Sequence, residues 1–197
     1  MIEGPIAASV AAADRASPRP SMLKVGAVVW LASELMFFSG LFAAYFTLRA
    51  TNPEWPPDSV HLNVARTAFF TALLVASSLT MHVAVGAAEV SDQRRAVLWT
   101  LITVLLGGLF ITNQAVEYAG LDFTHTSDAY GSMFFLMTGF HGLHVLGGLV
   151  LMGAVLAVGA GASGRLPLAD PLTVTGYYWH FVDVVWVAMF ATIYLIR

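Results

Sequence analysis

Cysteine is absent from this chain of 197 residues, and charged residues make up only 11% of it. Without thiols the chain cannot form disulfides, and it cannot bind an iron–sulfur cluster or copper through thiolates. Soluble domains usually carry about 25% charged residues, so this share excludes an ordinary soluble fold. The net charge of −3 is small and scattered, and it gives no reason to expect a nucleic-acid partner.

Hydrophobic residues make up 58% of the chain and gather in five long stretches. A helix needs about 20 mostly apolar residues to cross the hydrocarbon core of a membrane. We therefore predict an all-α, polytopic membrane protein that folds as a bundle of five transmembrane helices. The predicted spans lie near 23–49, 64–88, 96–118, 131–159 and 174–196, and polar or Pro- and Gly-rich segments connect them.

The basic residues predict the orientation of the bundle. The positive-inside rule places the loops richest in Lys and Arg in the cytoplasm. We predict a disordered cytoplasmic tail over 1–22, a transmembrane domain over 23–197 and an outer C-terminus. Six basic residues then lie on the cytoplasmic side (Arg15, Arg19, Lys24, Arg94, Arg95 and Arg165) and three on the other (Arg49, Arg66 and Arg197).

Seven ionisable side chains lie inside the predicted spans: Glu34, His82, Glu117, His141, His144, His180 and Asp183. A charged group at membrane depth costs about 2.5–3.5 kcal/mol on insertion scales, so such residues are usually functional or paired. Imidazoles at 141, 144 and 180 are possible metal ligands. However, glycines accompany the first two, and small residues together with inter-helix hydrogen bonds are also typical of close helix packing. The spacing favours packing.

Glu34 allows two interpretations. Surroundings of low polarity disfavour a charged carboxylate, so this acid is a candidate for exchanging a proton. It could equally form a hydrogen bond that ties the first span to a neighbour, and the residues leave both readings open. His180 and Asp183 are three positions apart on one helix face, where they can pair or share a partner on another helix. Structural pairing is favoured for them over catalysis.

Five ordered motifs add a family resemblance. They resemble subunit III of the haem–copper cytochrome c oxidases, and the match runs from about residue 23 to the C-terminus. The motifs are WLASELMFFSGLF at 30–42, QAVEY at 114–118, YGS at 130–132, TGFHGLHV at 138–145 and YWHFVDVVW at 178–186. Larger family members have seven spans in two bundles separated by a lipid-filled cleft, and this chain resembles the last five spans.

The resemblance implies a multi-pass subunit of a bacterial plasma-membrane oxidase, a complex that reduces oxygen to water with electrons from cytochrome c and pumps protons. The subunit is expected to pack on subunit I, with subunit II in the same complex. It is expected to have no catalytic centre and to bind no metal, since haem and copper are expected in the partner subunits. It is also expected to support proton uptake and the stability of subunit I.

The resemblance also assigns residues. Glu34 matches the family's carbodiimide-reactive buried carboxyl, and phospholipid is an expected ligand, with Trp30 and Glu34 as candidate lipid-binding residues. The polar packing framework would consist of His82, Glu117, His141, His144, His180 and Asp183.

The sequence leaves three alternatives for the function. The chain could be subunit III of a quinol oxidase, or a relative associated with nitric oxide reductases. A stand-alone proton channel or transporter belongs to another class, and the absence of an internal repeat disfavours it. A short five-span form is also compatible with a supercomplex that contains a cytochrome bc complex, although no residue demonstrates one.

Overall fold

The computed structural model describes residues 21–161 and 168–196, and it consists there of five long helices and the loops between them. The helices are α2 (Met22–Thr51), α3 (Val64–Glu89), α4 (Gln93–Ala119), α5 (Ala129–Gly161) and α6 (Ala169–Phe190), and a π-helical turn η1 (Ala191–Leu195) extends the last one. All five are long and apolar enough to cross a membrane. The predicted fold class is thereby confirmed. The tail predicted over 1–22 lies almost wholly outside the described residues.

Polar side chains at the loop ends start three of the helices. Ser21, Asn63 and Asp92 each accept a hydrogen bond from the backbone N–H three residues later, at the starts of α2, α3 and α4. These caps satisfy donors that would otherwise have no partner in the first turn. The sequence therefore encodes each start locally.

The last helix begins at Ala169, five residues before the start we predicted at 174. A span that starts near 174 leaves the pair Asp170-Pro171 in the preceding loop. Proline is tolerated in the first turn of a helix because its missing N–H would have no intrahelical partner there. Pro171 therefore lies within the first turn of α6 instead of preceding the helix.

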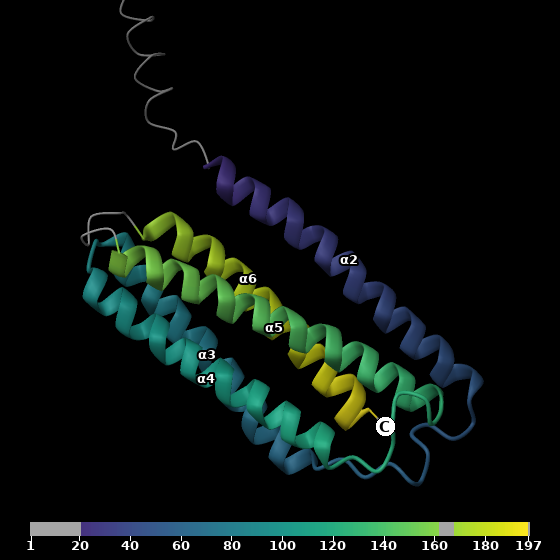
Figure 1. The fold of residues 1–197 in the computed structure, drawn as a ribbon. Helices are drawn as coiled ribbons and strands as arrows, with labels where there is room; N and C mark the ends of the chain where they lie inside the picture. Colours follow the sequence, from purple (N-terminus) through teal and green to yellow (C-terminus); the bar gives the residue numbers. More distant parts are fainter. Residues whose placement is uncertain (1–20, 162–167, 197) are drawn as a thin grey trace, which may run out of the picture.

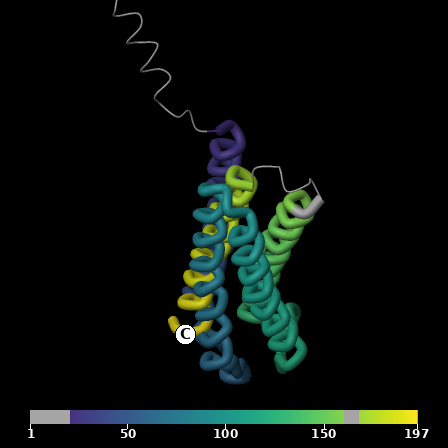
Figure 2. The backbone as a smooth tube through the Cα atoms, turned by 90° about the vertical axis from the view of Figure 1, so that its left-hand side faces the viewer, coloured from purple at the N-terminus to yellow at the C-terminus, as the bar shows by residue number. Residues whose placement is uncertain are grey.

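The helices form three layers: α2 alone, then α5 with α6, then α3 with α4 (Figure 1). Helices α3 and α4 form an antiparallel pair, with α3 against α6 and α4 against α5. The view from the side shows α6 beside α3 (Figure 2). The described chain starts and ends at opposite ends of the bundle, as an odd number of spans requires. Which end faces the cytoplasm stays a prediction.

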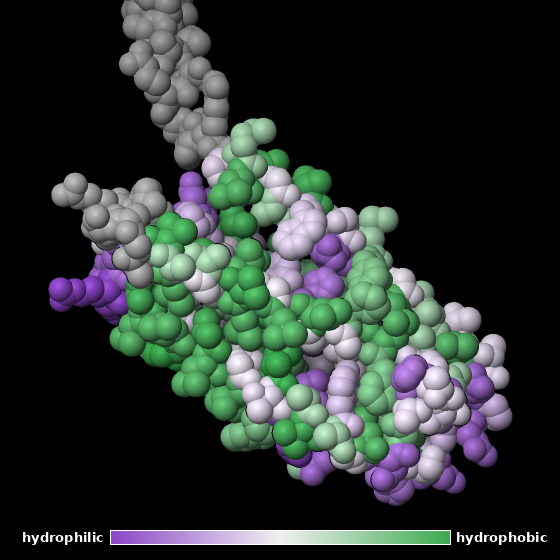
Figure 3. Space-filling view, viewed as in Figure 1, coloured by the Kyte–Doolittle hydropathy of each residue, from purple (hydrophilic) through white to green (hydrophobic). Residues whose placement is uncertain are grey.

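Helix α6 is the most buried of the five spans and α2 is the least buried. Only Phe38 and Tyr45 of α2 are fully buried, and the Tyr45 hydroxyl donates to the Thr192 carbonyl at 3.3 Å. The face of the bundle seen in Figure 3 is largely hydrophobic, with hydrophilic side chains at both ends and a few between α2 and α5. The bundle thus has a well-packed centre and one helix that is attached along a single side.

Trp179 of α6 lies at that centre, between two glycines. A Cβ atom added to Gly107 of α4 would lie 2.6 Å from the indole ring, and one added to Gly148 of α5 would lie 2.7 Å from it. The indole N–H donates to the Ser77 hydroxyl at 2.8 Å. Helices α4 and α5 can therefore approach α6 closely because their residues beside the indole lack side chains.

Candidate functional site

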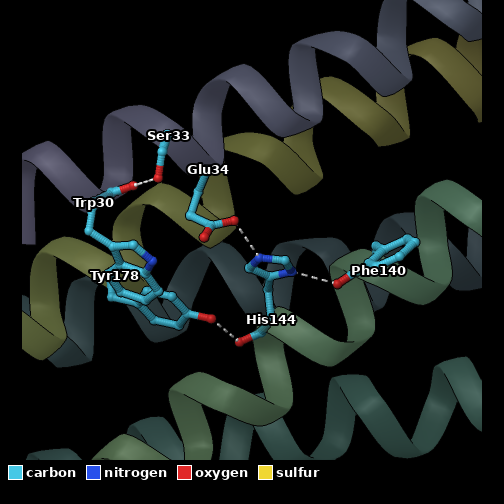
Figure 4. A network of polar contacts seen from close by, with 6 residues as sticks. All are labelled: Trp30, Ser33, Glu34, Phe140, His144 and Tyr178. Carbon is cyan, nitrogen blue, oxygen red and sulfur yellow. Dashed lines mark hydrogen bonds and ion pairs between the residues drawn. The ribbon is translucent and has the colours of Figure 1, made fainter.

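Glu34 of α2 and His144 of α5 form a contact that joins the outermost helix to the bundle (Figure 4). The distance between Glu34 Oε2 and His144 Nε2 is 3.1 Å, and the side chains are 22% and 16% exposed. The other ring nitrogen, Nδ1, lies 2.7 Å from the Phe140 carbonyl. A carbonyl only accepts hydrogen bonds, so Nδ1 carries a hydrogen there and the ring is fixed in orientation.

The hydrogen bond between Glu34 and His144 then requires one further proton. If that proton is on His144 Nε2, the contact is an ion pair, and if it is on Glu34 Oε2, both groups are neutral. In both cases the pair carries no net charge, which suits a site with little water. The arrangement can therefore hold a proton between two helices without leaving an unpaired charge.

Trp30 and Tyr178 lie beside this pair. Trp30 precedes Glu34 by one turn of α2, and its ring stacks on that of Tyr178, with centroids 5.2 Å apart and planes 1° apart. The Tyr178 hydroxyl donates to the His144 carbonyl at 2.8 Å. Helices α2, α5 and α6 thus meet at one place. The Trp30 ring is 44% exposed, so this place opens to the outside of the bundle.

Aromatic rings close the other side of the site. Phe38 is fully buried and meets the His144 ring edge-on at 4.9 Å. Phe37, one position earlier, contacts Phe140 at 5.0 Å. Phe38 thus shields one side of the Glu34–His144 contact, whereas Phe37 and Phe140 are exposed at the surface. Both side chains of the pair stay partly exposed.

A second polar cluster joins α3 to α6. Ser78 Oγ lies 2.9 Å from His180 Nδ1 and also donates to Asp183 Oδ2. The hydroxyl has a single hydrogen, which goes to the carboxylate, so it accepts from the imidazole. His180 and Asp183 therefore share a partner on another helix, which is one of the two arrangements that their spacing allowed.

A third cluster lies where α3 begins and α4 ends. Glu117 Oε1 accepts from Thr67 at 3.3 Å and from Tyr194 at 3.1 Å. Arg66 Nε donates to Asn113 Oδ1 at 2.6 Å. This cluster fixes the relative positions of α3, α4 and η1.

Two of the predicted framework residues do not join these clusters. His141 is fully buried and stacks on Trp186 with centroids 4.9 Å apart, but neither ring nitrogen has a hydrogen-bond partner in the part of the chain that the structure describes. His82 lies on the exposed face of α3. Within residues 21–161 and 168–196, no three imidazole or acidic side chains lie close enough together to hold a metal ion. The ionisable residues of the spans are instead distributed over separate contacts between helices.

The sequence does not single out Ser78 or indicate the hydrogen bond that Tyr178 donates, although both residues organise the polar contacts. Serine and tyrosine are ordinary residues in a span, and their partners lie 34 to 105 positions away in the sequence. The one available signal was that Tyr178 begins the last of the five motifs.

Comparison with known proteins gives a consistent result. The family model described as cytochrome c oxidase subunit III matches residues 10–196. A protein of Nocardia farcinica named probable cytochrome c oxidase subunit 3 is 48% identical, with 91% of this chain and 90% of that protein covered. A Mycobacterium tuberculosis protein of the same name is 49% identical over the same shares. The cytochrome c oxidase subunit 3 of Corynebacterium diphtheriae is 44% identical, again over 91% of this chain and 90% of that protein.

These names favour the cytochrome c oxidase alternative over the quinol oxidase one. The helices, the motifs and the comparisons agree with each other over nearly the whole chain. The chain is a multi-pass membrane protein and an accessory subunit of an oxidoreductase complex that contains other oxidase subunits. It belongs to the cytochrome c oxidase subunit III family.

Proposed function

We propose that this chain contains no redox centre and acts by packing its helices against subunit I, in a bacterial plasma-membrane complex that also contains subunit II. The haem and copper groups are then held by the partner subunits, and the chain sustains proton uptake and limits inactivation of subunit I during turnover. The ionisable side chains form separate contacts between helices, and this arrangement supports a structural and proton-linked function. Among these contacts, the Glu34–His144 pair is the main support for the proposal, because it can hold a proton at the edge of the bundle.

A complex purified without this chain tests the first part of the proposal. It should keep the haem and copper absorption spectra of the complete oxidase, and it should lose activity faster during turnover. Loss of the spectra together with the chain would contradict a purely accessory function. Proteins that co-purify in mild detergent would also reveal whether a cytochrome bc complex belongs to the assembly.

Variants of Glu34 separate proton exchange from packing. In Glu34→Gln the amide N–H can still donate to His144 Nε2, so the contact between α2 and α5 is kept but the exchangeable proton is lost. In Glu34→Ala both are lost. If the proton matters, both variants shorten the active lifetime of the oxidase; if only packing matters, Glu34→Gln behaves like the wild type. Glu54→Gln, at an exposed loop position, is the matched control.

We also propose phospholipid as a ligand beside Trp30 and Glu34. The exposed Trp30 ring supports this. A groove of about 560 Å³ between α2 and α6 offers further apolar surface next to Trp30 in the sequence, although its lining residues, among them Lys24, Val28 and Val29, do not include Trp30 or Glu34. Lys24 pairs with Asp170 at 2.9 Å. Lipid analysis of the purified complex tests it: Trp30→Ala should reduce the amount of phospholipid retained per complex, and unchanged retention would contradict the assignment.

A further inference from the structure

Asp183 of α6 is a buried acid with few groups around it that could stabilise a charge. The residue is 5% exposed. Its Oδ2 accepts a hydrogen bond from Ser78 of α3, whereas Oδ1 has no hydrogen-bond partner among the residues that the structure describes. A buried carboxylate with a single hydrogen bond is strongly disfavoured. The acid therefore needs either a cation nearby or a proton of its own.

Ser78 supplies a route for such a proton. Its Oγ bonds both His180 Nδ1, at 2.9 Å, and Asp183 Oδ2, so that imidazole, hydroxyl and carboxyl form a continuous chain of hydrogen bonds. A hydroxyl donates one hydrogen bond and accepts others, so the chain can run in either direction. In one state the imidazole donates to the hydroxyl, which donates to a carboxylate. In the other, a protonated carboxyl donates to the hydroxyl, which donates to Nδ1, and the heavy atoms stay in place.

His180 connects this chain of hydrogen bonds to the outside of the bundle. The residue is partly buried and lines the groove of about 560 Å³ between α2 and α6, together with Tyr177, one turn earlier on the same helix. Lys24 also lines the groove, and it pairs with Asp170 in the first turn of α6. The groove thus extends from that end of the bundle to His180. Because Nδ1 bonds Ser78, the Nε2 atom is the one available to accept a proton from the groove.

A second imidazole influences His180 from α3. His82 follows Ser78 by one turn, is exposed, and lies near enough to His180 to act on it electrostatically. Like charges repel, so a protonated His82 disfavours a positive charge on His180. It therefore favours the state in which the proton is on Asp183.

The imidazoles of α5, which also packs against α6, have contacts of their own. His144 pairs with Glu34, and His141 stacks on Trp186. Neither belongs to the hydrogen-bonded chain that ends at Asp183.

We propose that Asp183 is a second proton-holding site of this chain, loaded from the groove through His180 and Ser78. A proton from water at the mouth of the groove joins the lone pair of His180 Nε2. The Nδ1–H bond then breaks as a new O–H bond forms on Ser78, and the original Ser78 O–H bond breaks as its hydrogen passes to Asp183 Oδ2. The result is one proton taken up, a neutral carboxyl group and a neutral imidazole with its hydrogen on Nε2. The site is separate from the Glu34–His144 pair and does not depend on the proposed function.

Infrared spectroscopy of the complete oxidase tests whether Asp183 holds a proton. A protonated carboxyl has a C=O stretching band that a carboxylate lacks. The spectrum of the wild type minus that of Asp183→Asn, recorded over a range of pH, should contain this band, and the band should remain when both proteins carry Glu34→Gln. Absence of the band at every pH would overturn the site.

Exchange of the same proton for deuterium tests the route. After transfer to D₂O the band shifts, and Ser78→Ala should slow this shift by about 10²-fold, the lower end of the effect of a positioned proton-transferring group. His180→Phe should slow it similarly and decides the route on its own if Ser78→Ala does not assemble. Ser78→Thr, which keeps the hydroxyl, and Ser39→Ala, at an exposed serine that bonds only its own helix, should exchange at the wild-type rate. Wild-type exchange in His180→Phe would overturn the route.

Discussion

Replacing Gly148 with alanine should destabilise the bundle, because the indole of Trp179 occupies the space that a methyl group needs. The new Cβ would lie 2.7 Å from Trp179 Cε3 and 2.8 Å from Cζ3. Carbon atoms are most favourably separated by about 3.5–4.0 Å, so one contact is too short by about 0.8 Å. The ring cannot retreat easily, because Gly107 lies against it and Ser77 holds its N–H.

The magnitude follows from two opposing effects. Overpacking of a well-filled interior costs about 1–3 kcal/mol. Alanine also gains up to about 1 kcal/mol over glycine in a helix interior. Gly153→Ala isolates the second effect, because Gly153 lies on the same helix and a Cβ there meets nothing within 4 Å. The difference between the two variants should therefore be about 1–3 kcal/mol, with Gly148→Ala the less stable.

The assay is reversible unfolding in mixed detergent micelles, followed by tryptophan fluorescence or circular dichroism. Trp179→Phe provides a further test, because a smaller ring leaves room for the methyl group. The double variant should then lose less stability than the sum of the two single variants. Equal stability of Gly148→Ala and Gly153→Ala, or strict additivity in the double variant, would refute the close packing around Trp179.

Three other predictions follow from the polar contacts. Ser78→Ala removes the hydroxyl shared by His180 and Asp183 and should cost about 1–3 kcal/mol in the same unfolding assay, whereas Ser78→Thr, which keeps the hydroxyl, should cost less. Tyr178→Phe keeps the aromatic stack but removes the donor to the His144 carbonyl, so it should cost about 1 kcal/mol, and wild-type stability of this variant would contradict the assignment. A hydrophobic carbodiimide, which reacts with protonated carboxyls, should modify Glu34 more than the loop acids Asp122 and Asp128, as mass spectrometry of the digested chain would show; modification of the loop acids alone would indicate that the proton stays on His144.

The five spans could be predicted because length and hydropathy are local properties of the sequence. The predicted start of the last helix was wrong because it treats Pro171 as the boundary before the helix. Proline is in fact accepted in the first turn of a helix. The structure begins that helix at Ala169. This error concerns one turn and leaves the number and order of the helices unchanged.

The partners of the ionisable residues were harder to predict, because they depend on how each helix is rotated about its axis. A soluble helix reveals its inner face by its polar residues, but these spans are apolar on all sides. Glu34 and His144 are 110 positions apart, and Ser78 and Asp183 are 105 apart. The sequence indicated which residues need partners at membrane depth, and only the packing of the helices decides which partner each receives.

The distribution of contacts over the bundle links its stability to its function. Helices α3, α4 and α6 are held by buried rings and several polar contacts, among them Trp179 with Ser77 and Asp183 with Ser78. Helix α2 buries little of its surface. The Glu34–His144 pair is thus both a hydrogen bond that attaches α2 to α5 and a place for one proton. Under the proposed function, a change in the protonation of this pair would alter the attachment of α2 before it affected the rest of the bundle, so the response of the subunit would begin at α2.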